Sequence, residues 1–158
     1  MIASWPAGIR GRGLRKQFVD IIDITPTVLD IAGIAAPSVF NGVCQIPIQG
    51  KSIRATFDNP NSPSPRDVQY FELWGSRGIY SNGWEAIGIH RPGTDFDTDT
   101  WELYHTEVDF SQSVNLASQN PAKLEELKKL WWSEAAKNGA LPLLEAGGRS
   151  NTYNQALD

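Results

Sequence analysis

Short runs of aromatic and β-branched residues alternate with polar residues between positions 68 and 90. Gly75 interrupts these runs once, and Asn82-Gly83 interrupts them a second time. Asn-Gly readily adopts the positive φ of a two-residue hairpin turn, so the pattern predicts a β-hairpin over residues 68–90. An isolated ribbon cannot bury its own apolar face, and another element must cover it.

The best cover lies between positions 120 and 139, where apolar residues recur at helical spacing: Leu124, Leu127, Leu130 and Trp131. Asn120-Pro121 is expected to begin this helix and Gly139 to end it. Between the hairpin and the helix, Trp101 and Leu103 alternate with polar neighbours. We therefore expect residues 101–104 to form a further strand with these two side chains on one face.

The first fifty residues follow another pattern. Residues 2–5 and 18–22 are apolar and predict short strands or extended segments. Thr25 and Pro26 predict the N-cap and first position of a short helix that ends at Gly33. Pro, Gly, Asn and Ser dominate residues 37–66, which predicts a surface loop. Residues 51–67 are the expected linker, and residues 145–158, small and polar, the expected flexible tail.

Composition excludes several classes of function. The chain has 158 residues, a net charge of -4 and 41% hydrophobic residues, which are ordinary proportions for one globular domain. An acidic chain lacks the basic surplus that neutralises phosphates, so we expect no nucleic-acid partner. No apolar run approaches the roughly 18 residues that span a bilayer, so we expect no membrane partner. One cysteine, Cys44, allows no internal disulfide and leaves the compartment undecided between cytoplasm and periplasm.

Three groups of polar residues are candidate ligand sites. Arg10, Arg12 and Arg15 could receive an anion, although a solvated loop is the simpler interpretation. The spacing Asp95-x-Asp97-x-Asp99 imitates the start of a calcium loop, but its sixth position is Thr100 instead of Gly, which favours a solvated acidic turn. His90 and His105 without a third ligand do not make a zinc site.

The tryptophans allow two interpretations. Trp74, Trp84 and Trp101 could form an exposed stacking platform, as in a binding module, or they could fill the core between sheet and helix. Trp131 and Trp132 are neighbours on a helix and cannot share a face. One of these two is therefore expected to be partly exposed.

A succession of strings carries a family resemblance: WPAGI, FVDIIDITPTVLDIAGI, QGKSI, YFELWGSRGIYSNGWEAIGIH, WELYH and the segment from VDFSQS to GALPL. In this order and spacing they resemble the C-terminal portion of bacterial arylsulfatases, type I sulfatases of the alkaline-phosphatase-like superfamily. The resemblance covers residues 1 to about 144. It implies an α/β (α+β fragment) fold class: residues 1–50 as the last strand and helix of the large domain, then residues 68–144 as an antiparallel sheet packed on a C-terminal helix.

The resemblance also implies a chemistry that this chain does not carry. Family members use a formylglycine made within Cys/Ser-x-Pro-Ser-Arg, beside a divalent cation, calcium being expected. Cys44 is followed by Pro at the third position and lacks the Arg, and Ser64 stands in residues 62–66 where Pro is required. We therefore assign no catalytic residue and no metal ligand in this chain, and no cofactor to it.

The implied function is that of a supporting region of a sulfuric ester hydrolase, inactive alone, whose partners are an upstream catalytic domain and a small sulfate ester. His90 and Arg91, on the loop that leaves the hairpin, are the candidate residues for the rim of the substrate cleft. A stand-alone β-rich binding module and a pairing domain for a separate catalytic half stay open as alternatives. If the chain is a supporting region of a larger hydrolase, Val28, Leu29 and Ile31 would lack the sheet they cover. Residues 1–50 would then exchange amide protons fast.

Overall fold

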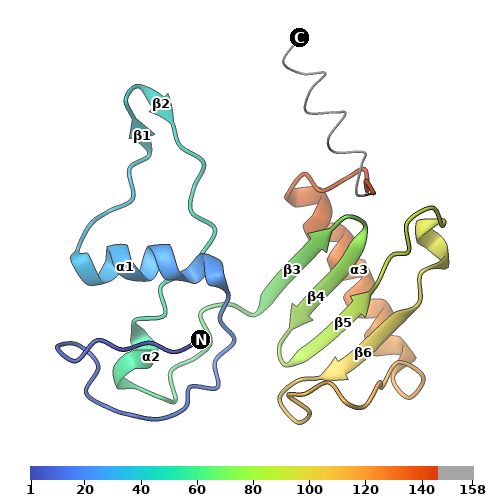
Figure 1. The fold of residues 1–158 in the computed structure, drawn as a ribbon, viewed down its shortest axis with the longest axis horizontal. Helices are drawn as coiled ribbons and strands as arrows, with labels where there is room; N and C mark the ends of the chain where they lie inside the picture. The colour runs from blue at the N-terminus through green and yellow to red at the C-terminus, as the bar shows by residue number, and fades with distance from the viewer. Residues whose placement is uncertain (146–158) are drawn as a thin grey trace. The chain divides into compact units, whose positions relative to one another are not determined.

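The structure, a computed structural model, describes residues 1–145 (Figure 1). The tail predicted for residues 145–158 therefore lies outside the described residues from position 146 onward. The chain divides into two compact units, Met1–Asp67 and Val68–Asp158. No helix within residues 1–145 has the length and apolar character needed to cross a membrane.

The second unit contains a four-stranded antiparallel sheet in the order β3-β4-β5-β6. Its strands are β3 (Val68–Leu73), β4 (Ser76–Ser81), β5 (Trp84–Gly88) and β6 (Trp101–His105). Two-residue turns join the first three: Trp74-Gly75 has φ of 52° and 86°, and Asn82-Gly83 has φ of 47° and 81°. Positive φ at both central residues matches the right-handed twist of the strands. The predicted hairpin is thus confirmed, with a second tight turn at Gly75, and β6 is the predicted additional strand.

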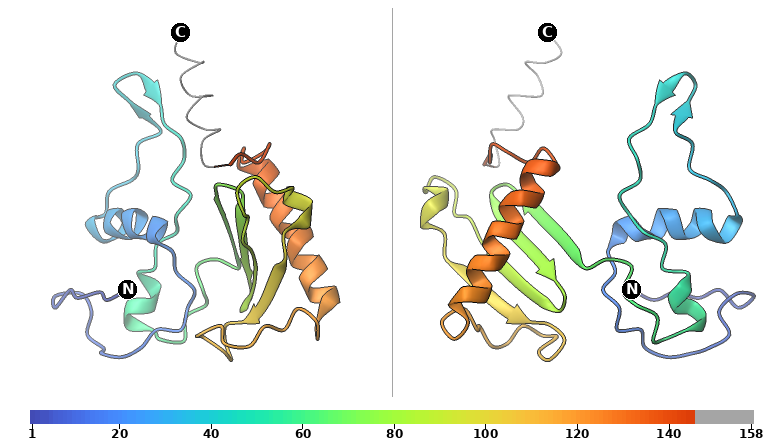
Figure 2. Two further views of the ribbon diagram at one scale, coloured as in Figure 1. Left: turned by 45° about the vertical axis from the view of Figure 1, so that its right-hand side comes forward. Right: turned by 180° about the vertical axis from the view of Figure 1, so that it is seen from behind.

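The helix α3 (Pro121–Lys137) crosses one face of this sheet (Figure 2). One residue from each strand shares a register row beneath it: Tyr70, Ile79, Ala86 and Leu103. Leu127, Trp131 and Ala135 of α3 pack against this row and are fully buried. Burying a Leu or Ile side chain contributes about 1.5–3 kcal/mol, so this layer is the main source of stability in the unit. The predicted sheet packed on a C-terminal helix is confirmed.

The cap of α3 differs from the prediction. Asn120 occupies the N-cap position, but its side chain makes no capping hydrogen bond there. Pro121 does begin the helix, and Gly139 follows its end with φ of 66°. Tertiary packing of the apolar face therefore stabilises α3 more than its N-cap does.

The first unit has little regular structure. Its elements are η1 (Ile21–Asp23), α1 (Ile24–Ala32), β1 (Val39–Phe40), β2 (Val43–Cys44) and α2 (Ala55–Asp58). The strand predicted at residues 2–5 is wrong, because this segment has no regular structure. For residues 18–22 the strand is wrong, and the alternative of an extended lead-in fits residues 18–20, which lead into η1. Apolar runs this short do not distinguish a strand from a helical turn.

The helix start predicted at Thr25 is also wrong. The helical segment begins earlier, at a capping box in which the Asp20 carboxylate accepts from the Ile22 amide, at 3.2 Å. The Asp23 carboxylate in turn accepts from the Asp20 amide, at 2.9 Å. Two reciprocal bonds satisfy more orphan donors than a single threonine would. The helix end at Gly33 is confirmed, with φ of 66°.

Asp23 also organises the segment predicted as surface loop. Its carboxylate, 1% exposed, accepts from the Lys51 amide at 2.8 Å and pairs with the guanidinium of Arg66. Ile53 and Phe57 are buried nearby in sequence. The description of residues 37–66 as purely surface loop is therefore wrong, because a buried carboxylate requires partners and this stretch supplies them.

Candidate functional site

The two predicted rim residues differ in burial, because His90 is buried and Arg91 is exposed. Ile87, Ile89 and Arg91 line a cleft on one side. Gly88 faces the other side, where a Cβ at this position would lie 2.9 Å from the Trp101 ring. His90 and Arg91 follow β5 and have different surroundings.

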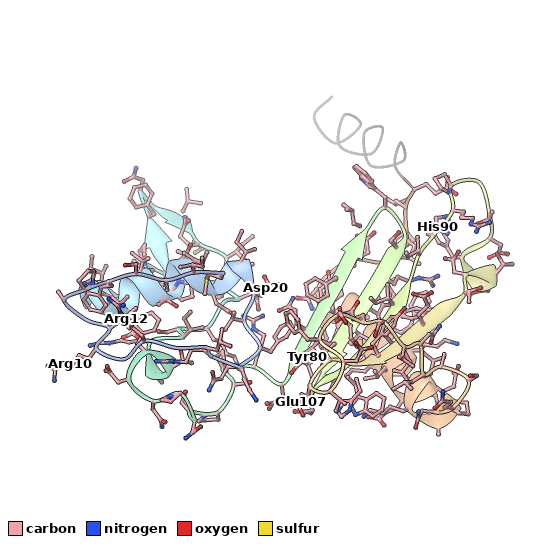
Figure 3. The ribbon with its side chains drawn as sticks, turned by 60° about the horizontal axis from the view of Figure 1, so that its bottom comes forward. Arg10, Arg12, Asp20, Tyr80, His90 and Glu107 are labelled. Carbon is pink, nitrogen blue, oxygen red and sulfur yellow. The ribbon has the colours of Figure 1, made fainter. Side chains whose placement is uncertain are left out.

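His90 is buried between two carboxylates. Its side chain is 0% exposed, and its Nδ1 lies 3.1 and 3.0 Å from the two carboxylate oxygens of Asp99. Its Nε2 lies 3.4 Å from Oε1 of Glu145, in the segment that follows α3. Figure 3 shows His90 at the end of the sheet. Both ring nitrogens are therefore already engaged by the protein itself.

Asp99 connects His90 to Arg77 of β4. The guanidinium of Arg77 pairs with the Asp99 carboxylate and donates to the Phe96 carbonyl at 2.9 Å. It also lies over the Trp101 ring, 5.1 Å from the ring centroid. Both partners of the ion pair have side chains less than 5% exposed, at 2% and 4%. This buried network of charges fixes the orientation of the imidazole.

The close packing around His90 depends on Gly75. A Cβ at this position would lie 2.9 Å from Cδ2 of His90 and 2.4 Å from the Phe96 ring. The Phe96 ring itself packs against the imidazole, with 4.1 Å between ring centroids. Only a glycine allows the β3–β4 turn to approach the ring this closely.

The cleft that contains Arg91 has a volume of about 460 Å³. Its wall combines aliphatic, hydroxyl and charged side chains: Ile87, Ile89, Arg91, Thr94, Thr98, Asp99, Thr100 and Glu102. Glu102 accepts a hydrogen bond from the Tyr104 hydroxyl at 2.8 Å. Burial and this carboxylate raise the pKa of the Tyr104 phenol above its usual range. Arg91 is exposed and is free to contact an anion in the cleft.

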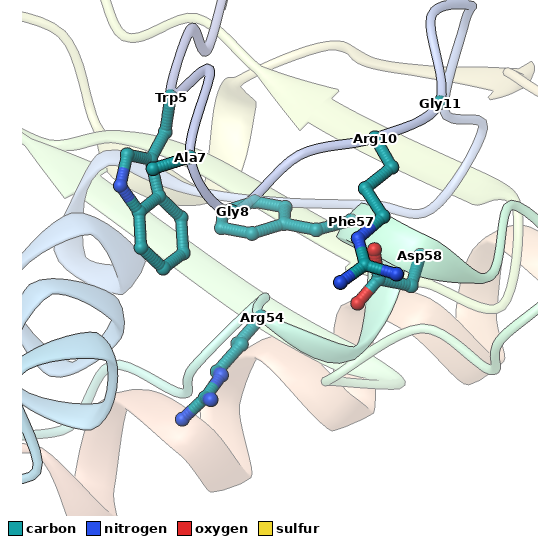
Figure 4. Close-up of a pocket in the computed structure, with 8 residues that line it drawn as sticks. All are labelled: Trp5, Ala7, Gly8, Arg10, Gly11, Arg54, Phe57 and Asp58. Atoms are coloured by element: carbon teal, nitrogen blue, oxygen red, sulfur yellow. The ribbon is translucent and has the colours of Figure 1, made fainter.

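A second cleft, of about 580 Å³, lies within the first unit (Figure 4). Arg10 and Arg54 line it together with Trp5 and Phe57. Of Arg10, Arg12 and Arg15, only Arg10 lines this cleft, and Arg10 and Arg12 are exposed, as the favoured interpretation of a solvated loop predicts. Arg15 donates instead to the carbonyls of Thr56 and Phe57, at 2.5 and 2.9 Å, and therefore has a structural role.

No described group of three or more His, Cys, Asp or Glu side chains could hold a metal ion. The acidic loop shows why. Asp95 caps η2 (Phe96–Thr98) by accepting from the Asp97 amide, whereas Asp99 turns inward to Arg77 and His90. The prediction of a solvated acidic turn is thus wrong for Asp99. The calcium and formylglycine that the resemblance implies do not fit residues 1–145, where Cys44 is an exposed thiol on β2.

Three of the six tryptophans, Trp84, Trp101 and Trp131, serve the core. Trp101 is 8% exposed and Trp131 is 0% exposed, and Trp84 stacks on His105 at 4.4 Å. Trp74 is 53% exposed, so it lies outside the core. Trp132 is 38% exposed, which confirms that the two adjacent tryptophans do not share an environment. The stacking platform of three tryptophans is wrong, because β-strand alternation turns Trp101 toward α3.

The sequence pattern did not single out Arg77 or Glu145, and it singled out Asp99 only as part of an acidic turn. Arg77 shares the strand parity of Ile79, and an arginine on the core side of a strand requires a buried partner. The core-side position of Arg77 could therefore be predicted from the sequence. Its partner Asp99 could not, because Asp99 lies in an ordinary polar loop.

Comparison with known proteins shows which proteins the chain is similar to. No family model matches the chain. A stretch of 143 residues, 89% of this chain, is 29% identical to an uncharacterized sulfatase, PB10D8.02c, of Schizosaccharomyces pombe. It covers 25% of that protein, so the chain spans about a quarter of the length of the curated relative that it matches.

Solved structures agree in fold. Ps i-CgsB superimposes with a TM-score of 0.54 at 19% identity, over 88% of this chain and 29% of that one. BT4656, solved in complex with its substrate D-glucosamine-2-N,6-O-disulfate, superimposes with a TM-score of 0.52 at 22% identity, over 77% of this chain and 24% of that one. The predicted resemblance is confirmed: the chain is similar to part of a sulfatase, consistent with its C-terminal region.

Proposed function

We propose that this chain is the C-terminal region of an arylsulfatase-like sulfuric ester hydrolase. It supplies scaffold and part of the substrate-cleft rim, and it does not hydrolyse sulfate esters alone. The formylglycine and the calcium ligands would belong to a catalytic domain upstream of it in sequence. Support comes from the similarity to a sulfatase over a quarter of that protein's length.

The observation that carries the proposal is the exposed apolar surface of the first unit. Large hydrophobic side chains more than 40% exposed occur from its first residue to β2 and beyond: Met1, Ile2, Leu14, Ile21, Ile24, Val28, Ile34, Val39, Phe40, Val43, Ile46 and Ile48. Self-sufficient soluble domains rarely expose so many. A further protein layer that covers α1 and the adjacent loops would remove the free-energy cost of exposing these side chains to water.

Within the proposal, Arg91 is the residue that contacts substrate at the rim. Its guanidinium is exposed in the cleft, and guanidinium groups bind sulfate oxygens through paired N–H donors. His90 acts indirectly, because its ring is enclosed and both nitrogens face carboxylates. It holds the start of the loop that carries Arg91.

The first experiment is an assay of the isolated chain with 4-nitrophenyl sulfate and calcium. We expect no turnover above the rate in buffer. Authentic turnover that survives repurification would overturn the proposal, because the chain would then contain a complete reactive centre.

The second experiment exchanges the matching quarter of an active arylsulfatase for this chain. The truncated parent, which is the arylsulfatase without this quarter, should be inactive. The fusion, which is the truncated parent joined to this chain, should recover activity. In the fusion, Arg91→Ala should raise KM about 10- to 100-fold with little change in kcat, as expected for a lost charge-assisted hydrogen bond. Arg12→Ala removes another exposed arginine, in the other unit, and should leave KM unchanged. An inactive but folded fusion would contradict the scaffold role.

The exposed apolar surface also favours a second candidate, a domain that pairs with a separately encoded catalytic half. Mixing this chain with the truncated parent distinguishes the two. Recovery of activity on mixing, at micromolar concentrations, supports pairing between chains. Recovery in the fusion alone supports one continuous protein.

A further inference from the structure

We infer that His90, Asp99 and Glu145 form a pH-sensitive latch, here the His90 latch. It fastens the segment after α3 to the loop of residues 91–99 when the imidazole carries two protons, and it opens when the imidazole is neutral. The inference does not depend on the proposed sulfatase role, since it concerns contacts within the second unit.

The hydrogen-bond inventory of the imidazole requires this behaviour. A neutral imidazole has one N–H donor and one acceptor nitrogen, whereas an ionised carboxylate only accepts. Asp99 faces Nδ1 at 3.0 Å and Glu145 faces Nε2 at 3.4 Å. The ring is 0% exposed, so water cannot substitute for either partner. Only the imidazolium donates to both carboxylates.

Glu145 is the partner that leaves on deprotonation. Asp99 is held by two partners: both of its carboxylate oxygens contact Nδ1 of His90, and it forms the ion pair with Arg77, with a side chain 4% exposed. Glu145 makes a single, longer contact to the ring, and its side chain is 40% exposed. Loss of the Nε2 proton leaves a lone pair facing the Glu145 carboxylate, which can turn to water.

The surrounding charges balance only in the closed state. Arg77 on β4 and the imidazolium oppose Asp99 and Glu145, two positive charges against two negative ones. Glu72 lies at the neighbouring β3–β4 turn and accepts from the Gly75 amide at 3.0 Å. The remaining charged groups of the adjoining loop are exposed: Arg91, Asp95 and Asp97. A neutral His90 leaves one uncompensated carboxylate, which favours release of the more exposed one.

Opening affects the cleft that contains Arg91. Oε1 of Glu145 also accepts from the Gly93 amide at 3.0 Å. Gly93 has φ of 81° and lies between Arg91 and Thr94, both of which line the cleft. Release of Glu145 therefore frees the turn that carries this wall. The latch couples one proton on His90 to the shape of the cleft.

The test is NMR spectroscopy of the complete 158-residue chain, with the pH varied until the His90 ring resonances change from the imidazolium to the neutral form. We expect the Gly93 amide shift to follow the His90 ring titration with the same midpoint. After correction for intrinsic exchange, the Gly93 amide should exchange about tenfold faster on the alkaline side. A Gly93 amide that does not respond while His90 titrates would overturn the inference.

Two variants separate the latch from general destabilisation. Glu145→Gln places an amide donor opposite the neutral Nε2, so Gly93 should stay protected across the pH range. Glu145→Ala should leave Gly93 unprotected across it. Glu134→Gln is the matched control, because Glu134 pairs with Lys137 within α3, and it should preserve the wild-type titration. Wild-type titration of Gly93 in Glu145→Ala would also overturn the inference.

Discussion

At the scale of single residues, Gly88 decides whether Arg77 and Trp101 can meet. The three share one register row across β4, β5 and β6, with Gly88 in the middle. A Cβ at Gly88 would lie 2.9 to 3.0 Å from the fused carbons of the Trp101 indole. The absent side chain therefore leaves the space in which the guanidinium covers the indole ring.

Gly88→Ala is expected to destabilise the second unit by about 1–3 kcal/mol, the usual cost of adding a methyl group to a packed core. Gly78→Ala is the matched control, because Gly78 is also a strand glycine and its nearest neighbour would be the Phe71 side chain at 3.6 Å. Its effect should be neutral or stabilising by up to about 1 kcal/mol. Urea unfolding followed by tryptophan fluorescence measures both. Equal midpoints for the two variants would contradict the packing argument.

At the scale of elements, α3 and the sheet depend on each other. Trp131 lies against the sheet, and its indole N–H donates to the Phe71 carbonyl of β3 at 2.9 Å. Its ring meets Tyr70 and Trp101 edge-on, with centroids 6.3 and 6.4 Å away. Aromatic pairs in this geometry add to the energy of burial. One side chain thus connects the helix to the first and last strands.

Trp131→Ala should therefore destabilise the unit by about 3–5 kcal/mol, whereas Trp132→Ala should cost about 1 kcal/mol or less. The two positions are adjacent in sequence and carry the same residue type, so helix propensity does not distinguish them. Thermal unfolding followed by far-ultraviolet circular dichroism measures the difference. Comparable losses in the two variants would show that α3 does not pack on the sheet by this face.

At the scale of the whole molecule, the two units differ in where their apolar residues lie. The connected core consists of residues of the second unit, around Ile79, Leu103 and Trp131. In the first unit, α1 leaves Ile24 and Val28 exposed by 44% and 57%. Exposed helices without a covering layer open easily, because little apolar surface is lost on opening.

Hydrogen exchange followed by mass spectrometry should separate the units. Amides of β4 and β5 should exchange at least about a hundredfold more slowly than those of α1. The dye ANS should bind the isolated chain through the exposed apolar surface, and a covering partner should displace it. Slow exchange throughout α1 in the isolated chain would show that the first unit is stable without a partner.

Much of the second unit could be predicted from sequence. Asn82-Gly83 specifies a hairpin turn through the backbone of two residues, and alternation places Trp101 and Leu103 on one face. The first unit was harder, because Asp23 draws its partners from Lys51 and Arg66, far along the chain. No local sequence pattern predicts such a pairing.

For the candidate site, too, some features follow from the sequence and others only from the tertiary structure. Residue types and their periodicity, which depend on neighbours only a few positions apart, determined by themselves the turns, the strands and the covering helix of the second unit. The tertiary structure alone decided that His90 turns inward and Arg91 outward. It also brought His90 to Asp99, 9 positions away, and to Glu145, 55 positions away. Those contacts exist because the sheet and α3 pack together, and burial of an ionisable ring requires partners that sequence spacing cannot identify.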